Sequence, residues 1–277
     1  MPEIDRSPKS KRRMEVRFLR LLLILGLISI LATVVMQANA LRFKPVAKLP
    51  VGMNSIGIAM ELVQSKQDVL DLTADPENRK MLRAQQQLDR FLFIPSYFFF
   101  FATLGAYGIV VLDRMRFSGY AITVLVSLAA LFDYFEDSGI IYALDHLEDP
   151  QPQHIWIWGY LKWGLLYAML IGTLPLFWRR WKSASLRILG FPFGLYAVFS
   201  GAAGVVACCL RHGGRVESAA TGLAAPILFF VLFAALFQFG VVRGLTAIAL
   251  FLRGFAATRW IVLWPTWKAG KDHPSAV

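Results

Sequence analysis

The sequence has little charge for its length. Only 17% of its 277 residues are charged, whereas 57% are hydrophobic and the mean hydropathy is +0.53. A soluble domain carries about 25% charged residues, because its surface faces water. The apolar surplus must therefore face lipid, which excludes an ordinary soluble protein.

Cysteine is almost absent, and the familiar catalytic motifs are missing. Cys208 and Cys209 are adjacent in sequence, which is a poor geometry for a structural disulfide and matches no metal-binding motif. The chain has no GxSxG motif, Walker A loop, dinucleotide fingerprint or CxxC pair. These absences exclude the familiar soluble-cofactor enzymes and leave any cofactor unidentified.

Long apolar runs are what the sequence has in abundance. A membrane-spanning helix needs about 20 apolar residues, because the hydrocarbon core is about 30 Å thick. The strand alternation expected of a membrane β-barrel is missing, so we predict an all-α polytopic bundle in one domain. Its five or six spans are expected at about 19–38, 91–112, 118–141, 158–177, 188–210 and 222–242.

Acidic residues are fewer than basic ones, 18 against 29, which gives a net charge of +11. The basic residues lie beside the apolar runs rather than on one polar domain, so we expect the lipid bilayer as partner and no nucleic acid. They cluster at residues 9–20, 114–116, 179–187 and 243–271, whereas the connection 143–157 has none. The positive-inside rule therefore predicts cytoplasmic N- and C-termini.

The N-terminal run has two interpretations. A basic head, an apolar stretch from Leu21 to Met36 and small residues at Ala38 and Ala40 resemble a secretory signal peptide with its cleavage site. The head is long for a signal peptide, and the apolar character continues through Ala40, which favours an uncleaved anchor. Both interpretations leave the C-terminus in the cytoplasm.

Two segments outside the spans have helical patterns. In 41–90, we expect the amphipathic stretch from Ser55 to Leu72 to lie on the outer membrane surface. Asp75-Pro76-Glu77 then marks a helix start that runs on into the second span. The tail 244–264 suits an interfacial helix, and Trp260, Trp264 and Trp267 at its end suit aromatic anchors.

Small residues recur at four-residue spacing in the fifth span. Such a pattern allows a neighbouring helix to approach closely, either within the monomer, which we favour, or across a dimer interface. The residues are Gly190, Gly194, Ser200, Gly201 and Gly204.

The strongest chemical signal is a set of acids in the third span. Asp133, Glu136 and Asp137 share one helical face, since they are three and four residues apart. An ionised acid at the bilayer centre costs about 2.5–3.5 kcal/mol, so these side chains should face the bundle or water. Asp133 lies about 22 Å from the cytoplasmic end of its span, which places the cluster in the outer half of the membrane.

Lys162 in the fourth span is expected at the same depth and is the natural counter-charge. The pair can form a binding or catalytic site, or an ion pair that only fixes helix packing. For Asp89, Arg90 and Tyr97, at the outer end of the second span, we favour a solvated start of the helix. We expect no metal site, because the three histidines on the outer side show no metal-ligand spacing; they are His146, His154 and His212.

Residues 20–145 resemble uncharacterised bacterial multi-pass membrane proteins. The resemblance is carried by one span after a basic head, the run Pro50 to Ile56 before Glu61, Leu88-Asp89-Arg-Phe-Leu-Phe-Ile94 with Tyr97, and Asp133-x-x-Glu136. In those proteins Asn often follows the glutamate, where this chain has Asp137. The resemblance implies no activity, but it implies one outer-side constellation of Glu61, Asp89, Tyr97, Asp133 and Glu136.

Two functional hypotheses follow for a protein of the bacterial inner membrane. In the first, the outer acidic site binds or modifies a lipid or other amphiphilic molecule, with Asp133 and Glu136 as acid/base or cation-binding groups and Lys162 as their partner. In the second, the chain is a non-enzymatic accessory or assembly subunit of a membrane complex. A hydrated cavity at Asp133 favours the first hypothesis, and dry ion pairing favours the second.

Overall fold

The described part of the computed structural model is helical and contains no strand. It covers all residues except 1–7, 47–48, 51, 113–114, 179–183 and 239–277. Six of its helices are long and apolar enough to cross a membrane, which confirms a polytopic all-α membrane protein. The chain divides into two compact units, Met1–Val231 and Leu232–Val277, and the description below concerns the first.

The six candidate spans coincide with the six predicted apolar runs. The expected tail helix at 244–264 lies outside the described residues. The helices of the first unit are α1 (Pro8–Ala40), α2 (Ile56–Glu61), α3 (Lys66–Leu72), α4 (Pro76–Leu88), the π-helical turn η1 (Asp89–Phe93), α5 (Ile94–Val110), α6 (Arg116–Asp145), α7 (Gln153–Trp178), α8 (Ala184–Cys209), α9 (Gly213–Ala220) and the short η3 (Thr221–Leu223).

The helix of the second span begins well before its apolar part, at the predicted start. Asp75 caps α4 by accepting a hydrogen bond from the Glu77 N–H at 2.7 Å, and Pro76 occupies the first turn. The helix then continues through η1 into α5 without a break. Pro95 explains the wider turn: it has no N–H and would clash with a carbonyl in a regular α-helix, whereas the π turn lets the Ile94 N–H reach the Asp89 carbonyl.

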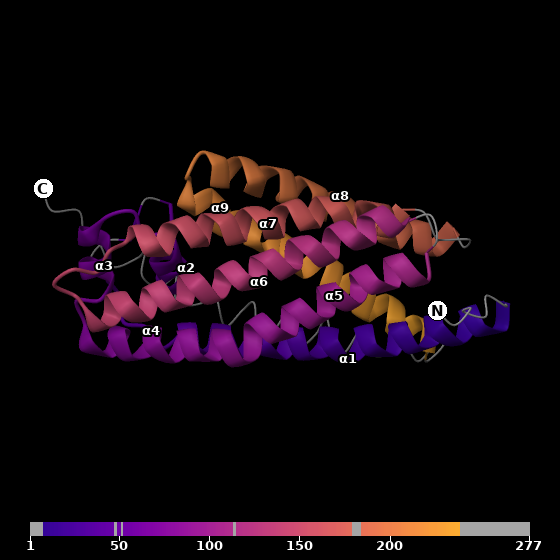
Figure 1. The fold of residues 1–277 in the computed structure, drawn as a ribbon, viewed down its shortest axis with the longest axis horizontal. Coiled ribbons are helices and arrows are strands. Elements are labelled where there is room, and N and C mark those ends of the chain that lie inside the picture. Colours follow the sequence, from indigo (N-terminus) through magenta and orange to yellow (C-terminus); the bar gives the residue numbers. More distant parts are fainter. Residues whose placement is uncertain (1–7, 47–48, 51, 113–114, 179–183, 239–277) are drawn as a thin grey trace, which may run out of the picture. The chain divides into compact units, whose positions relative to one another are not determined.

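Consecutive long helices pack side by side, in the order α1, α5, α6, α7 and α8 (Figure 1). α5 and α6 approach closely, because a Cβ atom on Gly119 would meet the backbone of Gly105. The small residues of α8 serve the same purpose within the chain: Gly201 and Gly204 face Tyr167 of α7. This agrees with the favoured interpretation of the fifth span, close packing inside the monomer.

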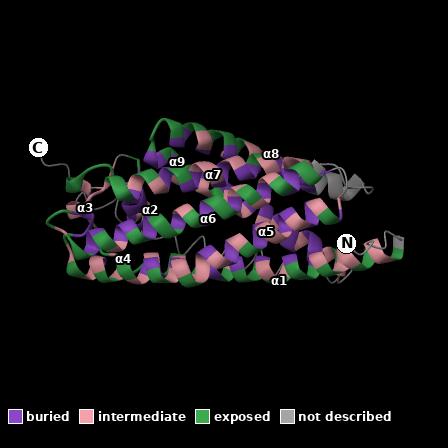
Figure 2. Cartoon of the chain, in the orientation of Figure 1, coloured by how far each residue is buried: buried purple, intermediate pink, exposed green. Residues whose placement is uncertain are grey.

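The N-terminal helix is an integral part of this packing. Leu19, Leu22 and Ala32 of α1 are fully buried, and the Ser29 hydroxyl donates a hydrogen bond to the carbonyl of Ser96 in α5 at 3.0 Å. The exposed residues of α1 and α4 follow their outer side, along the lower edge of Figure 2. Many of those in α1 are large and apolar, as expected of a surface in contact with lipid.

The stretch from Ser55 to Leu72 forms two short helices, α2 and α3. Ala59, Met60, Leu62 and Val63 are almost completely buried, so the segment packs onto the end of the bundle. Its apolar side chains therefore contact protein, and its place on the outer membrane surface stays a prediction.

Candidate acidic site within the helix bundle

Lys162 lies at the centre of a buried ion cluster. Its ammonium group donates hydrogen bonds to Asp133 Oδ1 at 2.7 Å and to Glu61 Oε2 at 2.9 Å, and it forms an ion pair with Glu136 Oε2 at 2.7 Å. All four side chains are at least 92% buried. Two of the three N–H donors of the ammonium group therefore make hydrogen bonds, and its charge also faces Glu136. The predicted pairing of Asp133 with Lys162 is present.

Glu61 reaches this cluster from outside the spans. It is the last residue of α2, and its Oε2 also accepts a hydrogen bond from the Trp163 indole N–H at 3.0 Å. α2 can approach α7 this closely because residue 159 is glycine: a Cβ atom there would overlap the carbonyl oxygen of Glu61. The close contact between Gly159 and α2 therefore determines where the Glu61 carboxylate lies.

Tyr97 connects the cluster to α5. Its hydroxyl donates a hydrogen bond to Asp133 Oδ2 at 2.8 Å, and the side chain is 5% exposed. Each Asp133 oxygen therefore has its own donor, Lys162 on one side and Tyr97 on the other. This arrangement fixes the orientation of the carboxylate between α5 and α7.

Asp89 and Asp137 extend the cluster. Both are buried, so the solvated start of the helix that we favoured for Asp89 and Tyr97 is wrong. Asp89 continues the buried face of α4, which consists mostly of polar side chains and therefore predicted exposure; Gln85 and Gln86 precede it on that face. Arg90 lies beside them, with Nε 3.4 Å from Asp137 Oδ2 and a guanidinium N–H bonded to Ser138 Oγ at 2.7 Å.

The cluster holds more acids than bases. Among the described residues, two basic side chains, Lys162 and Arg90, face five buried carboxylates. Asp89 Oδ1 and both oxygens of Asp137 are buried and have no hydrogen-bond partner there. An unpaired buried carboxylate is costly, so these groups require a bound proton or another cation. The five acids are Glu61, Asp89, Asp133, Glu136 and Asp137.

Three carboxylates of the cluster lie close together. One carboxylate oxygen from each of Asp89, Asp133 and Asp137 lies within 4.8 Å of the other two. Two oxygens that bind one Ca²⁺ from opposite sides, each at about 2.4 Å, are separated by about the same distance. These three residues therefore have the spacing of a site for a hard cation. The expectation of no metal site considered histidines, and His146, His154 and His212 are exposed.

All seven residues predicted for the site meet in this region. Sequence reasoning assigned no role to Trp163 and Gly159, which position Glu61. No signal in the sequence marks either residue, because their roles depend on the approach of α2 to α7. Comparison with protein-family models, curated proteins and solved structures gave no match. The resemblance noted above thus stays a prediction, and the fold and site define the protein only as a polytopic membrane protein with a buried acidic cluster.

Proposed function

We propose that this protein binds a hard metal cation inside the helix bundle, with Asp89, Asp133 and Asp137 as ligands. The observation that carries the proposal is the excess of buried carboxylates over basic side chains, together with the buried oxygens of Asp89 and Asp137 that have no hydrogen-bond partner among the described residues. Carboxylate oxygens are the ligands of Mg²⁺, Ca²⁺ and Mn²⁺ rather than of softer metals.

The contacts of Lys162 divide the cluster into two parts. Lys162 pairs with Glu61 and Glu136 on one side of the cluster, as well as with Asp133. The other side, at Asp89 and Asp137, has only Arg90, whose side chain is partly exposed. A cation with two positive charges would balance most of the remaining negative charge there.

We further propose that the molecule on which this site acts is a lipid or other amphiphile. The support is the position of the cluster beside the lipid-facing surface: Phe91, Tyr134 and Phe135 are all exposed large side chains next to its acids in sequence. By the distribution of basic residues, the protein belongs in the bacterial cytoplasmic membrane, with the cluster in the outer half and the C-terminus in the cytoplasm.

Metal titration of the purified protein in detergent tests the cation site. After treatment with a chelator, the thermal unfolding midpoint should rise with added Ca²⁺, Mn²⁺ or Mg²⁺, and equilibrium dialysis should find one ion per chain. Binding stabilises the folded state by about 2.7 kcal/mol at a hundred times the dissociation constant. The double variant Asp89→Asn with Asp137→Asn should lose this response.

Asp149→Asn is the matched control, because Asp149 is an exposed acid in the connection between α6 and α7. It should bind metal as the unchanged protein does. If no ion binds and the stability of the unchanged protein depends on pH alone, the excess acids hold protons and the metal proposal fails.

A second candidate function is that of an accessory or assembly subunit. The burial of Lys162 among three carboxylates favours it, because dry ion pairing of this kind can serve packing alone. The small residues of α8, which would have supplied a contact with another protein, pack against α7 instead. The metal titration distinguishes this candidate from the first, since a purely structural network binds no ion.

A further inference from the structure

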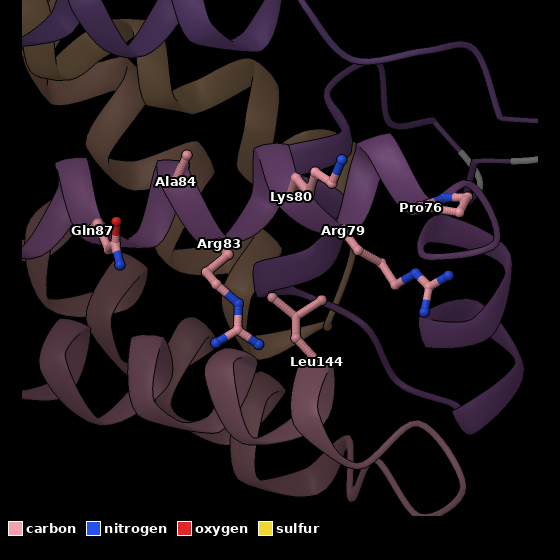
Figure 3. A pocket seen from close by; sticks show the side chains of 7 residues that line it. All are labelled: Pro76, Arg79, Lys80, Arg83, Ala84, Gln87 and Leu144. Carbon is pink, nitrogen blue, oxygen red and sulfur yellow. The ribbon is translucent and has the colours of Figure 1, made fainter.

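A hollow of about 500 Å³ lies between α4 and the end of α6. α4 contributes Arg79, Lys80 and Arg83 to its lining, and α6 contributes Leu144 (Figure 3). None of the residues of the acidic cluster lines it. Its volume is in the range of small-molecule sites, about 300–1,000 Å³.

The lining is basic and contains no acid. Lys80 pairs with Glu77 at 2.9 Å, and Arg83 pairs with Asp145, but all four side chains are at least 45% exposed. Exposed pairs of this kind contribute little and exchange readily. Arg79 Nε is buried and has no hydrogen-bond partner among the described residues. Lys80 and Arg83, in their exposed pairs, and Arg79 beside them thus supply the hollow with donors for an anion.

The hollow also lies at the level of lipid headgroups. Arg83 is about 40 Å along the continuous helix from Val110, at the opposite end of the span. The hydrocarbon core is about 30 Å thick, and headgroups increase the thickness to about 40–45 Å. Phe91, two turns closer to the core, is 83% exposed, which suits contact with acyl chains.

We propose that this hollow binds the phosphate-bearing headgroup of a membrane phospholipid. The planar guanidinium groups of Arg79 and Arg83 match phosphate oxygens, and they lie on either side of Leu144, which offers an apolar contact for the glycerol backbone (Figure 3). A lipid is the occupant that fits both the charge of the hollow and its depth. The proposal concerns residues other than the acidic cluster, so it does not depend on metal binding.

Native mass spectrometry of the full chain in detergent tests this proposal. We expect phosphatidylglycerol to bind at least tenfold more tightly than diacylglycerol with the same acyl chains. The double variant Arg79→Gln with Arg83→Gln should lose this preference, because charged hydrogen bonds to phosphate are each worth about tenfold in affinity or more. The exposed Arg215 of α9 provides the control: Arg215→Gln makes the same charge change elsewhere and should keep the preference.

Thermal unfolding of each variant establishes that it is folded. If the double variant does not fold, the single variant Arg79→Gln replaces it in the test. Arg79 has no ion pair among the described residues, so this change breaks none, and it should still reduce the preference for phosphatidylglycerol. Equal binding of the two lipids, or a double variant that behaves as Arg215→Gln does, would overturn the proposal. Displacement of the lipid by millimolar inorganic phosphate would also overturn it, because the hollow would then be a site for a soluble phosphate compound.

Discussion

Glu61 and Lys162 are about a hundred positions apart in sequence, yet the Glu61 carboxylate lies 2.9 Å from the Lys162 ammonium group. The first residue ends a short helix outside the spans, and the second lies inside α7. This ion pair couples the position of α2 to the charge balance of the bundle interior. Any change that separates α2 from α7 removes one of the three carboxylates around Lys162.

Gly159→Ala should cause such a separation. The added Cβ would overlap the Glu61 carbonyl oxygen, which belongs to the backbone and cannot rotate away. We expect lower thermal stability and faster hydrogen exchange in residues 56–72. The control is Gly164→Ala in the same helix, where the nearest atom is Cys208 Cβ at 3.9 Å. It should be neutral or stabilising by up to about 1 kcal/mol, the difference in helix propensity. Equal effects of the two changes would contradict the close approach.

Removal of the Lys162 charge alone should lower the stability of the protein more than removal of both charges of the Lys162–Asp133 pair. Lys162→Met leaves buried carboxylates without their counter-ion, a loss of about 3–5 kcal/mol for a fully buried pair. Lys162→Met combined with Asp133→Asn should be less destabilised than Lys162→Met alone. Thermal unfolding of the two single variants and the double variant forms the cycle. Strict additivity would show that Asp133 and Lys162 do not interact.

Tyr97→Phe should destabilise the protein by about 1.5–3 kcal/mol if Asp133 is ionised, because a buried carboxylate oxygen loses its donor. Tyr142→Phe is the comparison, since Tyr142 is an exposed residue near the end of α6. Its loss should be within about 0.5 kcal/mol. Chemical unfolding followed by tryptophan fluorescence measures both. Similar losses would mean that the Tyr97 hydroxyl contributes nothing specific.

The distribution of basic residues predicts the topology. An alkaline phosphatase fusion near Asp149 should be active, and one after Lys182 should be inactive, because the enzyme matures only outside the cytoplasm. Position 182 lies outside the described residues, but the connection that contains it joins α7 to α8. Activity after Lys182, or none near Asp149, would reverse the predicted orientation.

The N-terminal helix should remain in the mature protein. Phe100 and Leu104 of α5 are fully buried, and α1 packs against this helix. Removal of α1 would expose part of the apolar surface of α5. The intact mass of the purified protein measures this directly. A chain that starts at Leu41 would show that residues 1–40 are a signal peptide.

Most of the fold follows from the sequence, because each span needs only a long apolar run, and such runs are visible without any knowledge of packing. Asp133 and Lys162 were also predictable, since charges inside spans require partners at the same depth. The burial of Asp89 was not, because the face of α4 that packs onto the bundle is mostly polar, and a polar face indicates solvent. Nor was the position of Glu61, which depends on a close contact between α2 and Gly159.

The π turn at Asp89–Phe93 has a consequence for the relation between the two proposed sites. Each residue in a helix adds about 100° of rotation, so a single-residue deletion in this turn would rotate everything before it by that angle relative to α5. Arg79, Arg83 and Asp89 would turn together, as parts of one rigid rod, away from α6 and its acids. The basic hollow and the acidic cluster therefore both depend on how this helix is rotated about its own axis. A rotation that moves Arg79 and Arg83 also moves Asp89.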